Sequence, residues 1–239
     1  MKSTENILKI IGMLICLVFA LFPEYPQMLE LVVVGIILIT IGIPHGAIDH
    51  LTSEPKTTRK GLLFFLFHYL GMIGIYLILW ISFPLLSLVF FLLFSAYHFG
   101  QSHFFDKKKL RVADFFLFIL RGSFFISVIL LGDWEGTQKI LNPLVDLQGI
   151  EPLGYLALSL FFLTSVFFEW RIYHNIKNST WIDLVILTPL LYFSPLMISF
   201  IVYFGFWHAF PSMKLEYHYL KKLNRYYSIP KFLYHLLPF

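Results

Sequence analysis

Three histidines in apolar surroundings are the residues of this sequence best suited to chemistry. His45 lies in the segment GIPHGAIDH at 42–50, His98 in SAYHFGQ at 95–101, and His208 in FWHAFPS at 206–212. An imidazole at membrane depth is costly to bury, so each of them needs a partner or a function. Neutral imidazoles suit iron, copper or zinc, and with an open position they activate O2 on Fe(II) or water on Zn(II). Spacing alone leaves the metal open.

Long apolar runs must position these histidines. The chain is 58% hydrophobic and 13% charged, whereas soluble domains carry about a quarter charged residues, so it is an integral membrane protein. Most of the runs approach the roughly 20 residues that cross a bilayer. They cover residues 7–22, 28–48, 61–80, 84–105, 112–131, 152–170, 181–193 and 196–213. We predict an all-α, polytopic transmembrane helix bundle of about eight helices, with seven as the alternative because the last two runs are short.

Basic residues gather in alternate loops, which predicts the topology. They are Lys56, Arg59 and Lys60, then Lys107, Lys108, Lys109 and Arg111, then Arg171 and Lys177, and finally Lys214, Lys221, Lys222 and Arg225. By the positive-inside rule both termini are cytoplasmic, which favours an even number of helices. We therefore expect one multi-pass domain over 1–239 in the cell (inner) membrane, with 214–239 as a cytoplasmic or interfacial tail. The net charge of +4 reflects topology, and no nucleic-acid partner is expected.

This topology places the three histidines at one level. The second, fourth and eighth helices run in the same direction, and each histidine precedes the first lysine of the following basic segment by 6 to 11 residues. At 1.5 Å per residue they lie at comparable depths, and helix bundles build metal sites from facing helices in this way. We predict that His45, His98 and His208 share one site.

Helix phase separates the other candidate residues. Asp49 follows His45 by four residues and shares its face, so it either ligates or orients an imidazole, while His50 points elsewhere. On the fourth helix Ser102 shares the face of His98.

A proline and two glycines are expected to shape the helix that carries the first histidine. Pro44 removes one helical hydrogen bond and is expected to kink the helix. Gly42 and Gly46 are expected to let another backbone come close.

Several other classes of membrane protein can be compared with this pattern. Di-iron desaturases and hydroxylases need HxxxH and HxxHH boxes, which the sequence lacks. A rhodopsin-like protein needs a lysine inside a membrane helix, whereas each lysine here lies in a loop or near a helix end. A metal transporter or a haem-binding bundle remains open. The aromatic, apolar surroundings favour an apolar substrate that enters from the bilayer.

The segments GIPHGAID, SAYHFGQ and FWHAFPS resemble the Brp/Blh family of bacterial and archaeal membrane β-carotene 15,15'-dioxygenases. The resemblance implies Fe(2+)-dependent cleavage of the central double bond of β-carotene by O2 to two all-trans-retinal molecules. It implies that His45, His98 and His208 are iron ligands. Where the family has a further histidine this chain has Ser212, and His103 is the expected substitute ligand. We assign a catalytic role to Asp49, which would bond an imidazole or position water.

The resemblance also leads us to predict the substrate-binding residues and the partners. A hydrophobic tunnel for the polyene is expected to be lined by the aromatic residues Phe94, Tyr97, Phe99, Phe206 and Trp207. The expected partners are β-carotene, O2 and the lipid bilayer, with a functional link to a retinal-binding rhodopsin. The alternative hypothesis is a non-enzymatic membrane protein that binds or transports a metal or a retinoid.

Overall fold

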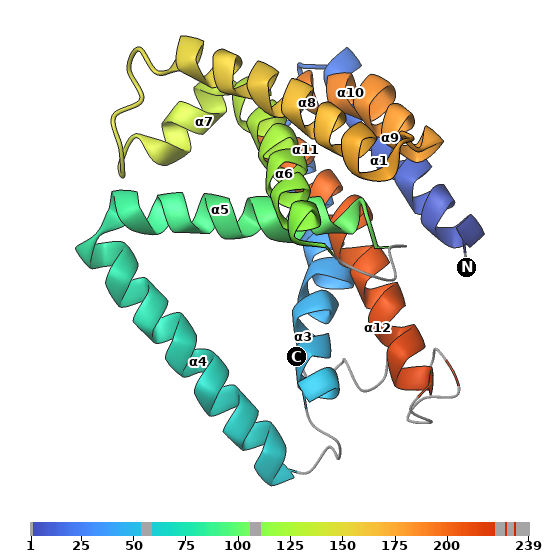
Figure 1. The fold of residues 1–239 in the computed structure, drawn as a ribbon. Coiled ribbons are helices and arrows are strands. Elements are labelled where there is room, and N and C mark those ends of the chain that lie inside the picture. The colour runs from blue at the N-terminus through green and yellow to red at the C-terminus, as the bar shows by residue number, and fades with distance from the viewer. Residues whose placement is uncertain (1, 54–58, 106–110, 223–227, 229–231, 233–239) are drawn as a thin grey trace.

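The structure is a computed structural model, which describes residues 2–53, 59–105, 111–222, 228 and 232, and all regular elements in these ranges are helical (Figure 1). The first half contains α1 (Lys2–Leu21), α2 (Gln27–Ile37), the π-helix η1 (Leu38–Gly42), α3 (Ile43–Ser53), α4 (Arg59–Ser82) and α5 (Pro84–Ser102). Next come α6 (Val112–Gly132), α7 (Trp134–Leu141) and α8 (Glu151–Tyr173). The chain continues with α9 (Asn178–Ile182), η2 (Asp183–Leu187), α10 (Thr188–Tyr192), α11 (Leu196–Val202), η3 (Tyr203–Ala209) and α12 (Phe210–Lys222).

The all-α class is confirmed, and all eight expected runs form helices. Seven helical segments of the described chain are long and apolar enough to cross a membrane. The remaining run forms the continuous segment α9–η2–α10, which is shorter than these seven. The stretch between the apolar runs 112–131 and 152–170, for which no helix was predicted, contains α7. Its first turn is capped by Asp133 Oδ1, which accepts from Gly136 N at 2.9 Å. The side of the membrane on which each terminus lies stays a prediction.

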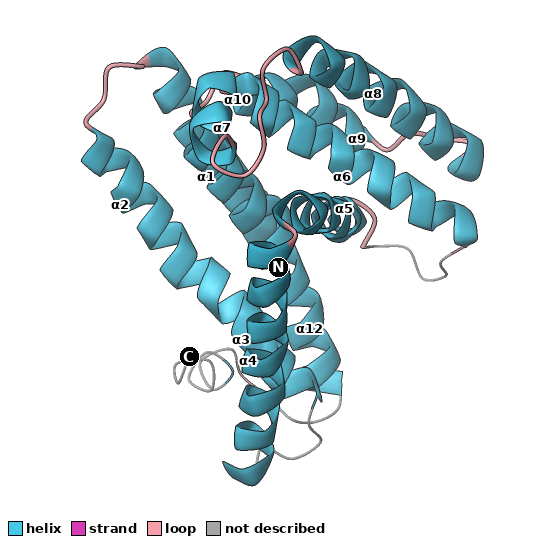
Figure 2. Ribbon diagram, turned by 90° about the vertical axis from the view of Figure 1, so that its left-hand side faces the viewer, coloured by secondary structure: helices cyan, strands magenta, loops and turns pink. Residues whose placement is uncertain are grey.

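Each π-helical segment ends two residues before a proline. Pro44 follows η1 in this way, Pro189 follows η2, and Pro211 follows η3. A proline has no N–H to donate, and its ring clashes with the carbonyl four residues earlier. A π-turn adds one residue to the turn and so relieves both problems. The irregularity expected at Pro44 is therefore a π-turn, and Figure 2 shows the helix continuing from α2 into α3.

Two glycines bring α5 and α6 into backbone contact. A Cβ on Gly100 would collide with the carbonyl oxygen of Phe118, and a Cβ on Gly122 would collide with that of Ala96. No side chain fits between the helices at these points, so a larger residue would force them apart. This contact fixes α5, the helix that carries His98.

The last helical segment lies at the centre of the molecule and α4 lies outside it. In the span Leu196–Lys222, 78% of the most apolar window is buried, compared with 0% in Leu63–Ser82. Figure 1 shows α4 extending away from the other helices. His208 therefore sits in the protein core, whereas α4 presents apolar side chains outward, as a helix exposed to lipid does.

A buried ion pair ties α6 to α8 away from the histidines. Arg121 Nη2 donates to Glu169 Oε2 at 2.8 Å, and both side chains are buried. Thr180 donates to Glu169 Oε1 at 2.9 Å and so fills the second carboxylate oxygen. Charges at membrane depth are tolerated when they are paired in this way.

Candidate metal centre

The structure brings together the three histidines for which a shared site was predicted. Their nearest ligand atoms all lie within 4.8 Å of one another. The ring centroids of His98 and His208 are 4.2 Å apart, those of His45 and His208 5.0 Å, and those of His45 and His98 6.3 Å. The rings come from α3, α5 and η3, three segments distant in sequence.

Two ring nitrogens of this group are buried without a hydrogen-bond partner among the described residues. They are Nδ1 of His45 and Nε2 of His208. A buried polar atom without a partner costs about 1–3 kcal/mol, so such atoms in a native structure call for an explanation. A metal ion bound by the three imidazoles would supply it. The donor set fits a borderline transition metal such as iron, copper or zinc.

The second nitrogen of His208 has a defined partner. Its Nδ1 lies 2.6 Å from Ser102 Oγ, one helical turn beyond His98 on α5. The imidazole is 1% exposed, and the Phe99 ring packs 4.9 Å from it. Metal-bound histidines usually engage their other nitrogen in this way, because the bond fixes the orientation of the ring.

His103, the expected fourth ligand, is not part of this group. Its Nδ1 lies 3.0 Å from Asp183 Oδ2, and its Nε2 lies 2.9 Å from the Tyr203 hydroxyl. The ring stacks on Phe125 with centroids 4.8 Å apart. Since both nitrogens are engaged, the structure gives His103 a different environment from that of the three clustered histidines. The sequence signal for this pair was an acidic residue, Asp183, inside the apolar run 181–193.

The other residues considered for the first shell differ in what the structure describes. The side chains of Asp49 and His50 lie outside the described residues, so the catalytic role assigned to Asp49 stays a prediction. Ser212, at the position where a fourth histidine was expected, donates from Oγ to Glu216 Oε1 at 3.2 Å.

Among the five aromatic residues expected to bind substrate, Phe99 lies beside the histidines. It also lines an apolar cavity of about 200 Å³ between α5, α6, α7 and α11, together with Ile129, Met197 and Phe200. Trp207 is buried and directs its indole N–H to Asp183 Oδ1 at 2.8 Å, on the side of His103.

The remaining three aromatics occupy other surroundings. Phe94 is 70% exposed on α5. Tyr97 packs on two phenylalanines of α6, with ring centroids 5.1 and 6.0 Å away. Phe206 is buried in the core against α1, where its ring leaves no room for a Cβ on Gly12.

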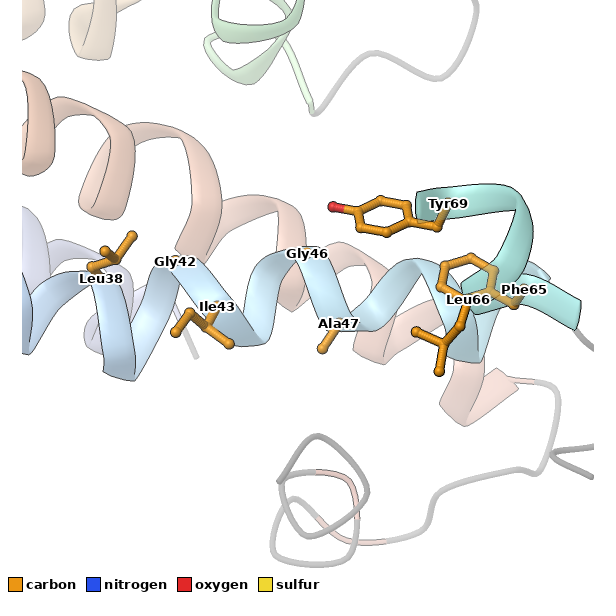
Figure 3. Close-up of a pocket in the computed structure, with 8 residues that line it drawn as sticks. All are labelled: Leu38, Gly42, Ile43, Gly46, Ala47, Phe65, Leu66 and Tyr69. Carbon is orange, nitrogen blue, oxygen red and sulfur yellow. The ribbon is translucent and has the colours of Figure 1, made fainter. Parts of the chain in front are cut away.

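A second apolar cavity, of about 300 Å³, lies between η1–α3 and α4 (Figure 3). Its walls include Phe65 and Tyr69 of α4, and its floor includes Gly42 and Gly46, on either side of His45 in the sequence. The close backbone contact expected at these glycines is absent from the described structure. A Cβ on Gly46 would meet no atom within 4 Å.

The other glycine of this floor leads towards the histidines. A Cβ on Gly42 would lie 3.1 Å from Cε1 of Phe204. The Phe204 ring centroid is in turn 6.2 Å from that of His45 and 5.9 Å from that of His208. Phe204 also stacks on Phe200, which lines the other apolar cavity.

Comparison with known proteins gives two matches. Residues 36–239 match the family described as beta-carotene 15,15'-dioxygenase. A protein named beta-carotene 15,15'-dioxygenase, from the uncultured marine bacterium 66A03, is 27% identical over 183 residues. That alignment covers 72% of this chain and 64% of the relative. No solved structure matches the chain significantly.

Proposed function

We propose the function of this chain from the family to which it belongs, the beta-carotene 15,15'-dioxygenase family, whose match covers residues 36–239. The chain cleaves the central 15,15' double bond of β-carotene with O2 and releases two all-trans-retinal molecules. The name of the bacterial relative supports this activity. The chain spans 64% of the length of that relative.

The observation that carries the proposal is the group of three histidines whose ligand atoms lie within 4.8 Å of one another. His45, His98 and His208 hold Fe(II) in the proposed enzyme. Neutral imidazoles are suitable ligands for iron, and bound iron supplies the O2-activating chemistry. The buried nitrogens of His45 and His208, which have no partner among the described residues, support a bound metal.

The surroundings of the histidines support an apolar substrate. One mainly apolar cavity is lined by Gly42 and Gly46 and the other by Phe99. Phe99 and Phe204 pack against the imidazole of His208. A long polyene has no polar group by which to be oriented, so the shape of its cavity must bring the central double bond to the histidines. Such positioning lowers the barrier by holding reacting groups in a productive geometry.

The lipid bilayer is both the location of the proposed enzyme and the source of its substrate. Seven apolar helices are consistent with a multi-pass protein of the cell (inner) membrane. β-Carotene dissolves in the hydrocarbon layer and reaches the cavities without crossing water. The retinal formed there is available to a retinal-binding rhodopsin in the same membrane.

The test is to express the full chain in cells that make β-carotene and to measure retinal. We expect loss of colour and formation of retinal by the wild type, and neither by the His98→Ala variant. His68→Ala is the matched control, because His68 lies on α4 and bonds the Phe64 carbonyl of its own helix at 2.9 Å. Unchanged carotene with a folded wild-type chain would instead favour a non-enzymatic metal- or retinoid-binding protein.

A further inference from the structure

Two adjacent residues at the end of α5 are tied to two adjacent residues of η3. Ser102 contacts His208 directly, and His103 reaches Trp207 through Asp183. We propose that Ser102 and the His103–Asp183 pair are positioning residues, which turn Nε2 of His208 towards the other two histidines. This inference rests on the proposed iron site. We call the following five residues the polar clamp: Ser102, His103, Asp183, Trp207 and His208.

A serine hydroxyl can accept from an imidazole N–H or donate to the bare nitrogen, and in the proposed arrangement Ser102 takes the acceptor role towards His208 Nδ1. A neutral imidazole carries its proton on one nitrogen and its lone pair on the other. When Nδ1–H donates to Ser102 Oγ, at 2.6 Å, the lone pair resides on Nε2. That is the nitrogen of His208 that is buried and has no partner among the described residues. The serine hydroxyl thereby prepares the ring to accept a metal.

The His103–Asp183 pair sets the rotation of η3. Asp183 accepts from Trp207 Nε1 through Oδ1 at 2.8 Å and from His103 Nδ1 through Oδ2 at 3.0 Å. With its proton on Nδ1, His103 accepts the Tyr203 hydroxyl at Nε2, at 2.9 Å. Tyr203 and Trp207 are thus both held, and His208 follows Trp207 in the chain.

The location of the clamp explains why η3 needs it. A π-helical turn is rare, and such turns are found frequently at functional sites. The turn in η3 precedes Pro211, and the clamp adds side-chain hydrogen bonds to its backbone bonds. The clamp supplies buried bonds with both nitrogens of His103 and both oxygens of Asp183 engaged, and satisfied buried networks are rigid.

The first measurement reads the tautomer without any metal. Nitrogen-15 NMR of histidine-labelled, metal-free full chain in lipid nanodiscs, at a pH where imidazoles are neutral, distinguishes Nδ1–H from Nε2–H, and a His208→Gln spectrum assigns the signal. We expect the Nδ1–H form in the wild type and a mixture of tautomers in Ser102→Ala. Ser102→Thr keeps the hydroxyl and should restore the wild-type signal.

The second measurement is anaerobic Fe(II) titration of the same variants. Loss of a hydrogen bond to a metal-bound histidine typically weakens binding by about 10- to 100-fold, which we expect for Ser102→Ala. The Asp183→Asn side chain still accepts from Trp207 but turns a donor towards His103. Its loss of Fe(II) affinity should therefore be smaller than that of Ser102→Ala. Ser199→Ala is the matched control, because this buried serine bonds carbonyls of its own helical segment.

The outcomes separate the clamp from the proposed function. Unchanged tautomer and unchanged Fe(II) affinity in Ser102→Ala would overturn the clamp. Equal losses in Ser102→Ala and Ser199→Ala, with equally lowered unfolding temperatures, would overturn it as well, because they indicate a general packing role. A wild-type chain that binds no Fe(II), but whose His208 tautomer still depends on Ser102, would support the clamp and refute the iron site.

Discussion

At the scale of single residues, neighbours decide which histidine can bind a metal. His45 and His208 each keep a buried nitrogen without a partner among the described residues, whereas His103 has Asp183 on one nitrogen and Tyr203 on the other. All three are histidines within or beside apolar runs, so residue type and approximate depth do not separate them. Their hydrogen bonds do, and those depend on side chains about 80 to 100 residues away in sequence.

Replacing His103 by glutamine should therefore leave the iron bound. The His103→Gln side chain keeps a donor for Asp183 but removes the imidazole. We expect its iron content, measured by mass spectrometry of the purified chain, to stay close to that of the wild type. In His98→Ala, which loses one of the three clustered rings, the iron content should fall below a tenth. Equal iron loss in both variants, with unchanged unfolding temperatures, would contradict this prediction and show that iron binding requires the imidazole of His103.

At the scale of helices, the site depends on how segments cross. The sequence predicts that the three histidines lie at one depth, on helices that run in one direction. Figures 1 and 2 together show α5 lying across α3 and α12 instead of alongside them. The convergence nevertheless holds, because Gly100 and Gly122 fix α5 against α6. Periodicity predicts the helices, but it contains no information on these crossing contacts.

Filling the cavity beside α3 should impair activity while leaving the fold intact. In Gly46→Leu the new side chain starts in open space and projects into the cavity of Figure 3. Replacing a helical glycine does not weaken the helix, so stability should be kept. We expect turnover of β-carotene to fall on the order of tenfold, since misplacing a substrate is costly.

The control for the Gly46→Leu variant lies on α2, which continues through η1 into α3. Gly35 also has no atom within 4 Å of a Cβ, but it does not line this cavity. Gly35→Leu should keep wild-type turnover, and both variants should bind the same amount of iron. Equal turnover in the two variants would show that substrate does not use this cavity.

At the scale of the whole molecule, composition and hydropathy predict much of the architecture. The apolar runs identified each long helix. The loop charges predicted the direction of each helix, and with it a common depth for His45, His98 and His208. Three features were not predicted, because hydropathy does not report on their causes. The helix α7 depends on its cap, the π-turns on the prolines that follow them, and the pairing of Asp183 with His103 on long-range packing. The apolar runs contain acidic residues at Asp183 and Glu169, and the structure shows that both are paired.

The decisive measurement for the proposed iron site is identification of the metal in the purified wild-type chain. The full chain should be purified in mild detergent from cells grown with iron, zinc and copper, and analysed by mass spectrometry. We expect close to one iron per chain, lost when His45, His98 or His208 is replaced by alanine. A folded chain that contains zinc, or no metal, would contradict it.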